Sequence, residues 1–429
     1  MTEPNNGYKV DDWPTMPDGT SFDGKNILTL VRNGNSPFKG AWDIHLLIDE
    51  IEDKLGARVV DIPFVSKGSN SYGFHIKMSN SLDIIARLAR GDVNMPNYVG
   101  FPFEMQGPDV EFEAAVYSLL RSDPVIVVSR LFYYRVPIRS EGPKLSIPKD
   151  ITGRRLFLFE RAEGEKNVWE ELGPDDKTHL VTQSAHIRAS LFNLNLPSDF
   201  VSEWFLKRVF GDKPEVLPIP VSPTREFFVA FFMSKIEATI KNIGDKIGWK
   251  ENNLTVGPIT FAAKQSLLRL VPHIMPKDGN EASLYRFVLD HGDYGIHNMS
   301  ITTDESGHPL VTSLYDWEVG CVTPAIISDP TMEVYITLLA DENASPAIDR
   351  FEDDARPEDH VDYMIWSKQY FKTLYEFAPD YEHVIRAGKD ARHLWFALRD
   401  WQSDDAEDYF GELGNWAERR MKELGITTD

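Results

Sequence analysis

The chain of 429 residues lacks the features that mark secreted and membrane proteins. It contains one cysteine, Cys321, so neither an intramolecular disulfide nor a cysteine-based zinc cluster can form. No apolar run approaches the ~20 residues that a membrane-spanning helix requires, and the N-terminal residues lack the basic start and apolar stretch of a signal peptide. We therefore expect a cytoplasmic protein in a reducing compartment, without a membrane partner.

Basic residues are scarce relative to acidic ones. The chain has 45 Lys and Arg against 67 Asp and Glu, a formal net charge of −22, and no run of Lys and Arg interleaved with aromatic residues. Such a field repels a nucleic-acid backbone, so we expect no nucleic-acid partner, although a nucleotide held through a metal ion remains compatible with it. An acidic surface also suits a cationic substrate. The contents of hydrophobic residues (42%) and charged residues (26%) are typical of a globular protein, and the length allows two or three domains.

The first part of the chain carries mostly strand signals. Residues 1–40 are polar and rich in Asn, Asp, Gly and Pro, which predicts an irregular N-terminal extension. The spacing of apolar residues predicts helices over Ala41–Leu55 and Asp109–Arg121. Runs of β-forming residues predict strands at Arg58–Val65, Tyr72–Met78, Leu82–Leu88, Pro124–Ser129 and Arg155–Glu160. Residues 41–162 are therefore expected to form a small antiparallel α+β lobe.

Residues 163–429 have a mainly helical pattern. Helices are predicted at Asp175–Leu194, Glu226–Ile247, Phe261–Leu270, His360–Phe377 and Ala391–Glu423. A β-like stretch, Ser300–Trp317, with a turn at Asp304–Gly307, interrupts these helices, and the prolines of Trp204–Thr224 indicate a long loop. The predicted fold class is α+β with two lobes, a small antiparallel β-sheet lobe with one helix and a larger, mainly helical lobe.

One constellation of polar residues in the second lobe suits phosphoryl transfer. Asp290–Asp293 reads D-H-G-D, Asn298 follows five positions after Asp293, and Asp316–Glu318 (D-W-E) comes after the β-like stretch. Asp and Asn supply the hard oxygen ligands that magnesium prefers. A separate Asp near an attacking hydroxyl can accept its proton or aim it, and phosphoryl transfer asks little more of side chains. Each residue alone is typical of a turn or cap, so the specificity lies in the joint pattern.

This H-G-D-x4-N…D-W-E pattern resembles the signature of the aminoglycoside phosphotransferase and choline kinase family, in which H-G-D stands where protein kinases have H-R-D. The resemblance implies a protein-kinase-like fold and transfer of the γ-phosphate of ATP, with Mg²⁺, to a hydroxyl of a small molecule. It implies that Asp293 is the catalytic base and that His291, at the start of the catalytic loop, is also a catalytic residue. It also implies that Asn298 and Asp316 bind magnesium, with Glu318 near the metal site.

The segment Lys67–Phe74 (KGSNSYGF) is similar to the nucleotide loop of that family. Glycines in such a loop let the backbone approach phosphate groups. Taken alone, a turn rich in Gly, Ser and Asn between two strands is more often only a turn. Its position before the next strand makes it better evidence for a nucleotide loop. The residues expected to contact the nucleotide are Gly68, Ser69, Asn70 and Gly73.

The family places a cation for the nucleotide phosphates in the third strand, where this chain has Arg87 instead of the lysine of protein kinases. Arginine recognises phosphate as a planar fork rather than as a point charge. The resemblance makes Glu113, in the following helix, the partner of Arg87. Glu111 is the alternative, and because residues two apart point to different sides of a helix, only one of them can pair.

The stretch Phe157–Gly164 (FLFERAEG) resembles the segment that joins the two lobes in the family. The resemblance implies that backbone groups at Glu160, Arg161 and Ala162 bind the adenine. The acceptor is expected over the helical lobe, and its identity cannot be read from the sequence.

Two other functions remain open. The same fold can belong to a catalytically weak or inactive nucleotide-binding protein, although the sequence retains each of the required groups. A metal-dependent hydrolase could use His291, Asp293 and His297 as ligands of zinc or iron. That alternative leaves the nucleotide loop, Asn298 and Asp316 without a role. The chain contains no G-x4-G-K-[ST], G-x-S-x-G or H-E-x-x-H motif.

Overall fold

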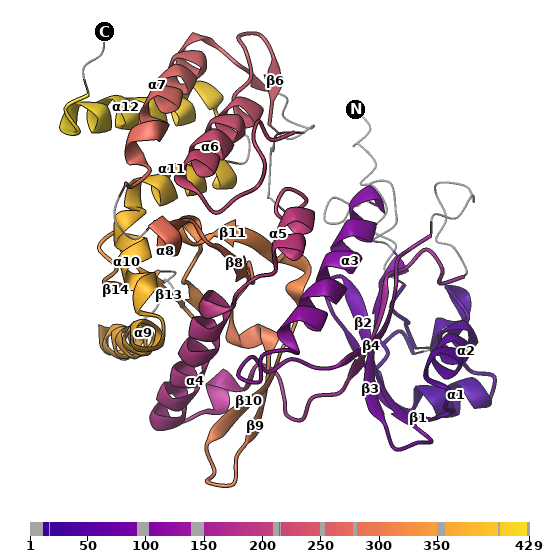
Figure 1. Ribbon diagram of the computed structural model, residues 1–429. Helices are drawn as coiled ribbons and strands as arrows, with labels where there is room; N and C mark the ends of the chain where they lie inside the picture. The colour runs from indigo at the N-terminus through magenta and orange to yellow at the C-terminus, as the bar shows by residue number, and fades with distance from the viewer. Residues whose placement is uncertain are drawn as a thin grey trace. The chain divides into compact units, whose positions relative to one another are not determined.

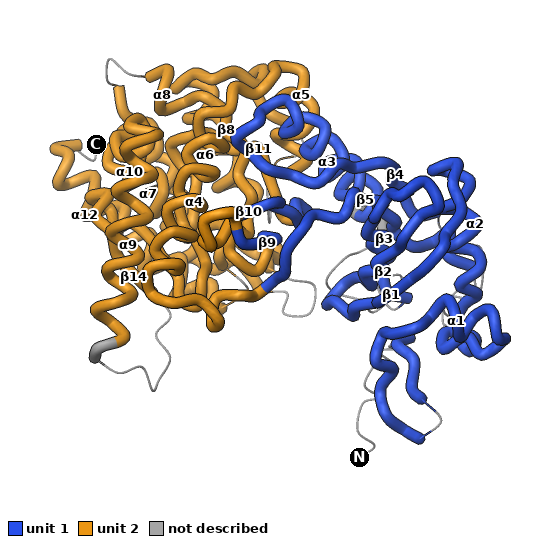
Figure 2. Tube along the Cα trace, turned by 90° about the horizontal axis from the view of Figure 1, so that it is seen from below, with its two compact units in different colours: residues 1–166, 299–303, 311–318 blue, residues 167–298, 304–310, 319–429 orange. Residues whose placement is uncertain are grey.

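The computed structural model describes residues 12–16, 18–91, 103–138, 150–208, 214, 216–248, 254–277, 281–349, 357–401 and 404–426. The chain divides into two compact units (Figure 2). The sheet unit comprises residues 1–166, 299–303 and 311–318, and the helical unit comprises residues 167–298, 304–310 and 319–429. The chain thus first passes from the sheet unit to the helical unit after residue 166. The sequence predicts the boundary between the lobes close to this point, after residue 162.

The sheet unit is built on antiparallel strands in the order β1-β2-β3-β5-β4 (Figure 1). The strands are β1 (Val59–Lys67), β2 (Ser71–Met78), β3 (Asp83–Ala89), β4 (Leu131–Arg135) and β5 (Leu156–Glu160). Along β3, Ile84, Ala86 and Leu88 belong to the buried core on one face, and the alternation of a strand places Arg87 on the other. Arg87 lies opposite Phe157 of β5 in the register of the two strands.

Helices cover both faces of this sheet. Figures 1 and 2 show α1 (Ile27–Arg32) and α2 (Ile44–Leu55) on one face and α3 (Phe103–Leu120) on the other. The helix predicted at Asp109–Arg121 lies within α3 apart from its last residue. Helix α2 lies within the helix predicted at Ala41–Leu55, whereas α1 was not predicted. The sheet unit therefore has more helices than the one of the predicted fold class.

The prediction of an irregular extension over residues 1–40 is wrong for the described part beyond residue 26. Besides α1, a 3₁₀ helix forms at Pro37–Gly40, and the side chains of Phe22 and Phe38 are buried in the core. Further toward the N-terminus, the buried carboxylate of Asp12 pairs with the buried guanidinium of Arg154 at 2.7 Å. Isolated aromatic anchors between polar residues carry no helical period, so the pattern gave no sign of this packing.

The strand predicted at Pro124–Ser129 is also wrong. The segment has no strand assignment, and β4 begins at Leu131 instead. Its polar backbone groups are satisfied elsewhere, because Leu314 N donates to Val127 O at 2.8 Å and Ser129 N donates to Ser313 Oγ at 3.0 Å. A short apolar run does not by itself distinguish a sheet strand from an extended segment.

The helical unit contains the predicted helices and several further ones. Its helices are α4 (Pro174–Asn193), α5 (Ser198–Trp204), α6 (Arg225–Thr239), α7 (Pro258–Ile274), α8 (Glu281–Tyr285), α9 (Pro357–Phe377), α10 (Pro379–Ala387), α11 (Lys389–Asp400) and α12 (Ala406–Glu423). Helix α12 packs along α7, and α4 packs along α9. Within the described residues, no helix is long and apolar enough to cross a membrane.

Two of the predicted helices are too long. The one predicted at Glu226–Ile247 ends at Thr239, and its last two residues pair as β6 (Lys246–Ile247) with β7 (Leu254–Thr255). The one predicted at Ala391–Glu423 is two helices, α11 and α12. The break is stabilised by Asp405, whose side chain accepts hydrogen bonds from the amides at the start of α12.

Short strands position the polar constellation. Strand β8 (Phe287–Asp290) pairs with β11 (Cys321–Pro324), and β9 (Met299–Thr303) pairs with β10 (Pro309–Leu314), the predicted hairpin. Another small sheet has the order β12 (Met332–Glu333), β13 (Thr337–Ala340), β14 (Pro346–Asp349). The sequence did not predict β8, β11 or β12–β14, each of four residues or fewer. The α+β class, with a small antiparallel sheet unit and a larger, mainly helical unit, is confirmed.

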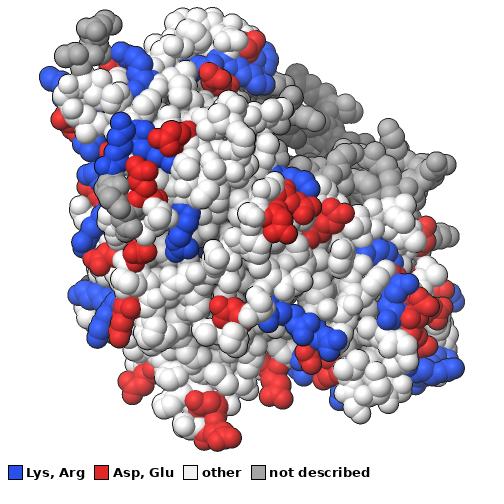
Figure 3. Space-filling model, in the orientation of Figure 1, with Lys and Arg blue, Asp and Glu red and all other residues white. Residues whose placement is uncertain are grey.

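The charged side chains of the described residues are mixed in sign on the face that Figure 3 shows. Acidic and basic side chains lie interspersed over both units, with an acidic group near the middle of the view.

Candidate active site

The catalytic loop of the helical unit begins where β8 ends, at Asp290, directly opposite Cys321 of β11. Gly292 turns the chain with φ +77°, and a Cβ at this position would lie 2.2 Å from Val319 O. Both the left-handed backbone and the close approach exclude a side chain here. The glycine of the H-G-D motif is therefore required by the turn that brings Asp293 out of the strand.

A buried ion pair between Arg188 and Asp290 stabilises this turn. Arg188 of α4 lies 3.3 and 3.2 Å from the two carboxylate oxygens of Asp290 through Nη2. The amides of Gly292 (3.2 Å) and Asp329 (2.9 Å) also donate to Asp290. Burial opposes the charge of Asp290, but Arg188 and the two amides hold the pKa of its carboxyl below the ordinary value. Sequence reasoning missed Arg188, which lies 102 positions from its partner.

The carboxylate of Asp293 interacts with two later residues of the same loop, His297 and Asn298. His297 Nε2 lies 3.1 Å from Asp293 Oδ1, and Asn298 Nδ2 donates to Asp293 Oδ2 at 3.0 Å and to Asp293 O at 2.9 Å. The hydrogen bond with His297 and that from Asn298 lower the pKa of Asp293 against partial burial. The structure thus brings together the Asp and the Asn that the motif pairs.

His291 does not reach the solvent. Its side chain is fully buried, and its ring lies 6.0 Å from the ring of Tyr294, whose hydroxyl donates to Ser184 O at 2.7 Å. This placement supports the loop from the core. The catalytic role of His291 stays a prediction.

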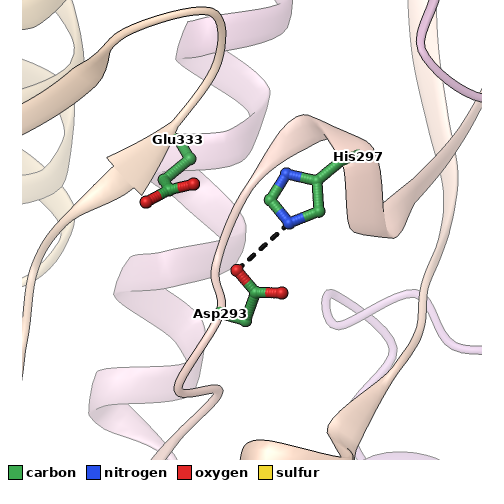
Figure 4. Close-up of side chains that lie close together, drawn as sticks. All are labelled: Asp293, His297 and Glu333. Carbon is green, nitrogen blue, oxygen red and sulfur yellow. Dashed lines mark hydrogen bonds and ion pairs between the residues drawn. The ribbon is translucent and has the colours of Figure 1, made fainter. Parts of the chain in front are cut away.

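The residues that cluster around Asp293 differ from the trio of the hydrolase alternative. One possible ligand atom from each of Asp293, His297 and Glu333 lies within 4.8 Å of the other two, and His291 does not belong to this group (Figure 4). Sequence reasoning missed Glu333, because its strand, β12, has only two residues and Glu333 lies 40 positions after Asp293.

A cavity of about 630 Å³ within the helical unit is lined by Asp293 and Glu333. This volume is typical of small-molecule sites. Its wall combines aromatic rings with charged groups of both signs, among them Phe205, Phe231, Trp395, Asp329, Asp349, Arg208 and Arg399. Asp293 thus belongs both to the loop and to the wall of the cavity.

The sheet unit carries the other half of the constellation. Arg87 Nη2 contacts the Glu113 carboxylate, and Arg87 Nη1 donates to Asp316 Oδ1 at 3.2 Å. The guanidinium also lies over the ring of Phe157, 4.9 Å from its centroid. Glu113 is 1% exposed, whereas Glu111 is exposed. The structure therefore pairs Arg87 with Glu113, the residue preferred over Glu111 on the sequence.

Burial and the neighbouring charges shift the pKa values of Arg87 and Glu113 in opposite directions. Burial disfavours the charge of Arg87, but the carboxylates of Glu113, Asp316 and Glu318 raise the pKa of its guanidinium above the ordinary value. Burial raises the pKa of Glu113 to about 7, and Arg87 opposes that rise. Arg87 therefore stays charged, while Glu113 titrates near neutral pH.

Asp316 adopts an uncommon backbone conformation, φ +68°. Left-handed Asp residues occur in a small fraction of positions and persist where the surroundings fix them. Here the next residue, Trp317, is fully buried and holds the segment. The Asp316 side chain itself is 38% exposed and remains accessible to a ligand.

Glu318 bridges the nucleotide loop and β5. Asn70 Nδ2 donates to Glu318 Oε1 at 3.0 Å, and Arg155 Nη1 donates to Glu318 Oε2 at 3.2 Å. Both carboxylate oxygens of Glu318 thus have partners within the sheet unit. Arg155 was not singled out on the sequence, where it is only the first residue of the strand predicted at Arg155–Glu160.

The predicted nucleotide loop forms the turn between β1 and β2. Gly68 N donates to Ser71 O at 2.9 Å, which closes the turn. Arg90 Nη1 donates to Ser69 O at 3.1 Å, and Arg90 N donates to Asn70 O at 3.0 Å. The loop is therefore fixed to the end of β3 by a residue that the sequence did not single out.

The predicted adenine segment begins at Glu160, the last residue of β5. The amide of Glu160 donates to Arg130 O at 2.8 Å, and the amide of Arg161 donates to Asp83 O at 2.9 Å. These two amides are therefore already engaged, which leaves Ala162 as the first candidate for an amide contact with the base.

No protein-family model matches the chain, and no curated protein matches it. Solved structures resemble it at low identity. An ADP-bound aminoglycoside phosphotransferase has 12% identity and a TM-score of 0.45, over 88% of this chain and 98% of its own. A streptomycin–ATP–APH(2'')-IIa complex has 12% identity and a TM-score of 0.43, over 89% and 98%. A type I macrolide 2'-phosphotransferase has 13% identity and a TM-score of 0.37, over 87% and 96%. Such values establish no shared activity, and the functional assignment rests on the side chains.

Proposed function

We propose that the protein is a small-molecule kinase that transfers the γ-phosphate of ATP, with magnesium, to a hydroxyl group. The observation that carries this proposal is the geometry of Asp293. Its carboxylate hydrogen bonds with Asn298 at 3.0 Å and lines a cavity of small-molecule size. A carboxylate so placed can receive the proton of an alcohol while the neighbouring amide serves a metal ion.

The donor set fits magnesium. Because Asn298 uses its amide nitrogen on Asp293, its carbonyl oxygen is the atom suited to a cation. The Asp316 carboxylate, which belongs to the sheet unit and is 38% exposed, is the other magnesium ligand that the resemblance implies. Amide and carboxylate oxygens are the protein ligands that magnesium prefers, and the ion neutralises charge on the phosphates. Glu318 also remains a predicted metal residue, but we propose that it chiefly braces the nucleotide loop, because both of its oxygens have partners.

The nucleotide would be bound by the sheet unit. In this proposal, the charged guanidinium of Arg87, oriented by Glu113, binds the α- and β-phosphates. The turn at Gly68–Asn70, with Gly73, covers them, as the resemblance implies. The adenine would meet the backbone beyond Glu160 and Arg161, at Ala162.

The chemical step needs one proton acceptor. The acceptor oxygen bonds to the γ-phosphorus as the bond between that phosphorus and the β–γ bridging oxygen breaks, and ADP leaves. The hydroxyl proton passes to Asp293. His297 and Asn298 hold the carboxylate in place for this step, and His291 supports the loop from the core.

The cavity wall favours an acceptor that carries amino groups. Asp329, Glu333 and Asp349 add carboxylates beside Asp293, and aromatic rings supply apolar contacts. A cationic amine over aromatic faces and near carboxylates is stabilised by both. We therefore place amino alcohols and amino sugars first among candidate acceptors, ahead of neutral sugars.

An ATP-consumption screen over amino alcohols, neutral sugars and aminoglycosides tests the proposal, with Asp293→Asn as the inactive variant. We expect turnover with at least one acceptor, a loss of about 10²–10⁴-fold in kcat in the variant, and unchanged Mg-ATP binding. Mg-ATP binding without turnover would support the inactive nucleotide-binding alternative. Absence of both binding and turnover would refute the kinase assignment.

A further inference from the structure

The catalytic loop and strand β12 bring together three side chains that can ligate a metal ion, Asp293, His297 and Glu333 (Figure 4). His297 Nε2 and Asp293 Oδ1 are 3.1 Å apart. Zinc bonds of about 2.0–2.2 Å in a tetrahedral site put neighbouring ligand atoms about 3–3.5 Å apart, so these two atoms already have a suitable spacing. Glu333 offers a carboxylate oxygen within 4.8 Å of one ligand atom of each of the other two residues, so a small movement of its side chain would complete the set.

The backbone fixes the two segments that supply the ligands. Glu333 N donates to Tyr294 O at 2.9 Å, and Gly295 forms a parallel bridge with Glu333. The loop and β12 are therefore joined through the backbone at Glu333, the residue that supplies the third side chain. Formation of a metal site would require only side-chain adjustment, which lowers the entropic cost of binding.

The chemistry of the set distinguishes it from a magnesium site. An imidazole with two carboxylates suits zinc and the other late first-row metals, whereas magnesium prefers oxygen ligands and retains its waters. We propose that Asp293, His297 and Glu333 form a binding site for Zn²⁺, separate from the magnesium ligands. Three protein ligands leave a fourth position for water or an inhibitor.

Binding of Zn²⁺ here would block the proposed chemistry, and this consequence rests on the proposed function. Asp293 Oδ2 accepts from Asn298, so the ion would take Oδ1, the oxygen near His297. Asp293 and Glu333 both line the cavity. The ion would therefore occupy the side of the carboxylate that the acceptor hydroxyl must approach. Zinc inhibition should then be competitive with the acceptor and not with Mg-ATP.

Calorimetric titration of the full-length protein with ZnCl₂, without nucleotide, tests the site directly. We expect one Zn²⁺ per chain, bound more tightly than Mg²⁺ under the same conditions. Loss of a group that only supports a ligand costs about 10–100-fold in metal affinity, so Glu333→Gln and His297→Gln should each lose at least about tenfold. Circular dichroism of each variant checks that it is folded.

Two control variants distinguish Zn²⁺ binding at this site from Zn²⁺ binding at other carboxylates and histidines of the helical unit. Asp349→Asn removes a carboxylate of the same cavity, and His308→Gln breaks a second His–carboxylate pair, with Asp176 at 3.2 Å. Both should bind Zn²⁺ as the wild type does. Zinc affinity that is unchanged in Glu333→Gln and His297→Gln, or lost in His308→Gln, would overturn the proposal. Zinc binding with the expected variant pattern but no kinase activity would support the site and contradict only the proposed function.

Discussion

Glu318 accepts a hydrogen bond from the side-chain amide of Asn70, 248 positions earlier in the chain, at 3.0 Å. Its other carboxylate oxygen accepts from Arg155 at 3.2 Å. The side chain of Arg155 is only 4% exposed, and that of Glu318 is 14% exposed. Glu318 therefore fixes the turn of the nucleotide loop and compensates a buried cation at the same time.

We expect Glu318→Gln to weaken Mg-ATP binding by about tenfold, because a hydrogen bond to a charged group contributes about 1.5–3 kcal/mol. Glutamine keeps an oxygen for Asn70 but loses the charge that faces Arg155. Calorimetric titration with ATP at several magnesium concentrations measures the effect, and the half-saturating magnesium concentration should not change. Asp53→Asn, at an exposed position of the same unit, is the control. A raised magnesium requirement would instead identify Glu318 as a metal ligand.

Glu113 should make the stability of the protein depend on pH. Burial raises its folded pKa from 4.5 to about 7. The stability contributed by the protonated carboxyl is fully present below pH 4.5 and is lost as the pH rises through 7, a change of about 3 kcal/mol. Chemical unfolding between pH 4.5 and 8 should therefore show the wild type losing stability relative to Glu113→Gln. Glu111→Gln, at the exposed position two residues earlier, should follow the wild type, and identical pH profiles for all three proteins would contradict the prediction.

Gly292→Ala should impair the catalytic loop. The added Cβ would meet Val319 O at 2.2 Å in a left-handed conformation, so the loop must shift. We expect a loss of about 1–3 kcal/mol in the free energy of unfolding, and a fall in kcat because Asp293 moves with the loop. Gly307→Ala is the matched control, since Gly307 has φ +86° but no atom within 4 Å of its added Cβ. Equal losses in both variants would show that only the backbone conformation matters.

Local sequence patterns predicted the parts of this protein that depend on neighbours in the chain. The motif from His291 to Asn298 is such a case, because Asp293 and Asn298 interact within one loop. The alternation along β2 and β3 is another, because each residue's face follows from its position in the strand. The break before α12 also had a local signal in Asp405, an N-cap residue that the long apolar period obscured.

Side chains whose partners are distant in the sequence could not be predicted in this way. Arg155 and Glu318 are 163 positions apart, and Arg188 and Asp290 are 102 apart. Nothing in the surrounding residues of either arginine indicates a buried partner, because burial depends on the packing of the whole unit. Glu333 is similar, since a two-residue strand gives no periodic pattern.

The pairing of Arg188 with Asp290 should be visible in a double-mutant cycle. Arg188→Met leaves the carboxylate of Asp290 buried without its cation, which should cost about 3–5 kcal/mol in the free energy of unfolding. Arg188→Met combined with Asp290→Asn removes both charges and should cost less than the sum of the single changes. Lys207→Met, which breaks an exposed pair with Glu203 at 3.5 Å, should cost about 0–1 kcal/mol. Additive losses in the double variant would show that Asp290 is stabilised by its backbone amide donors rather than by Arg188.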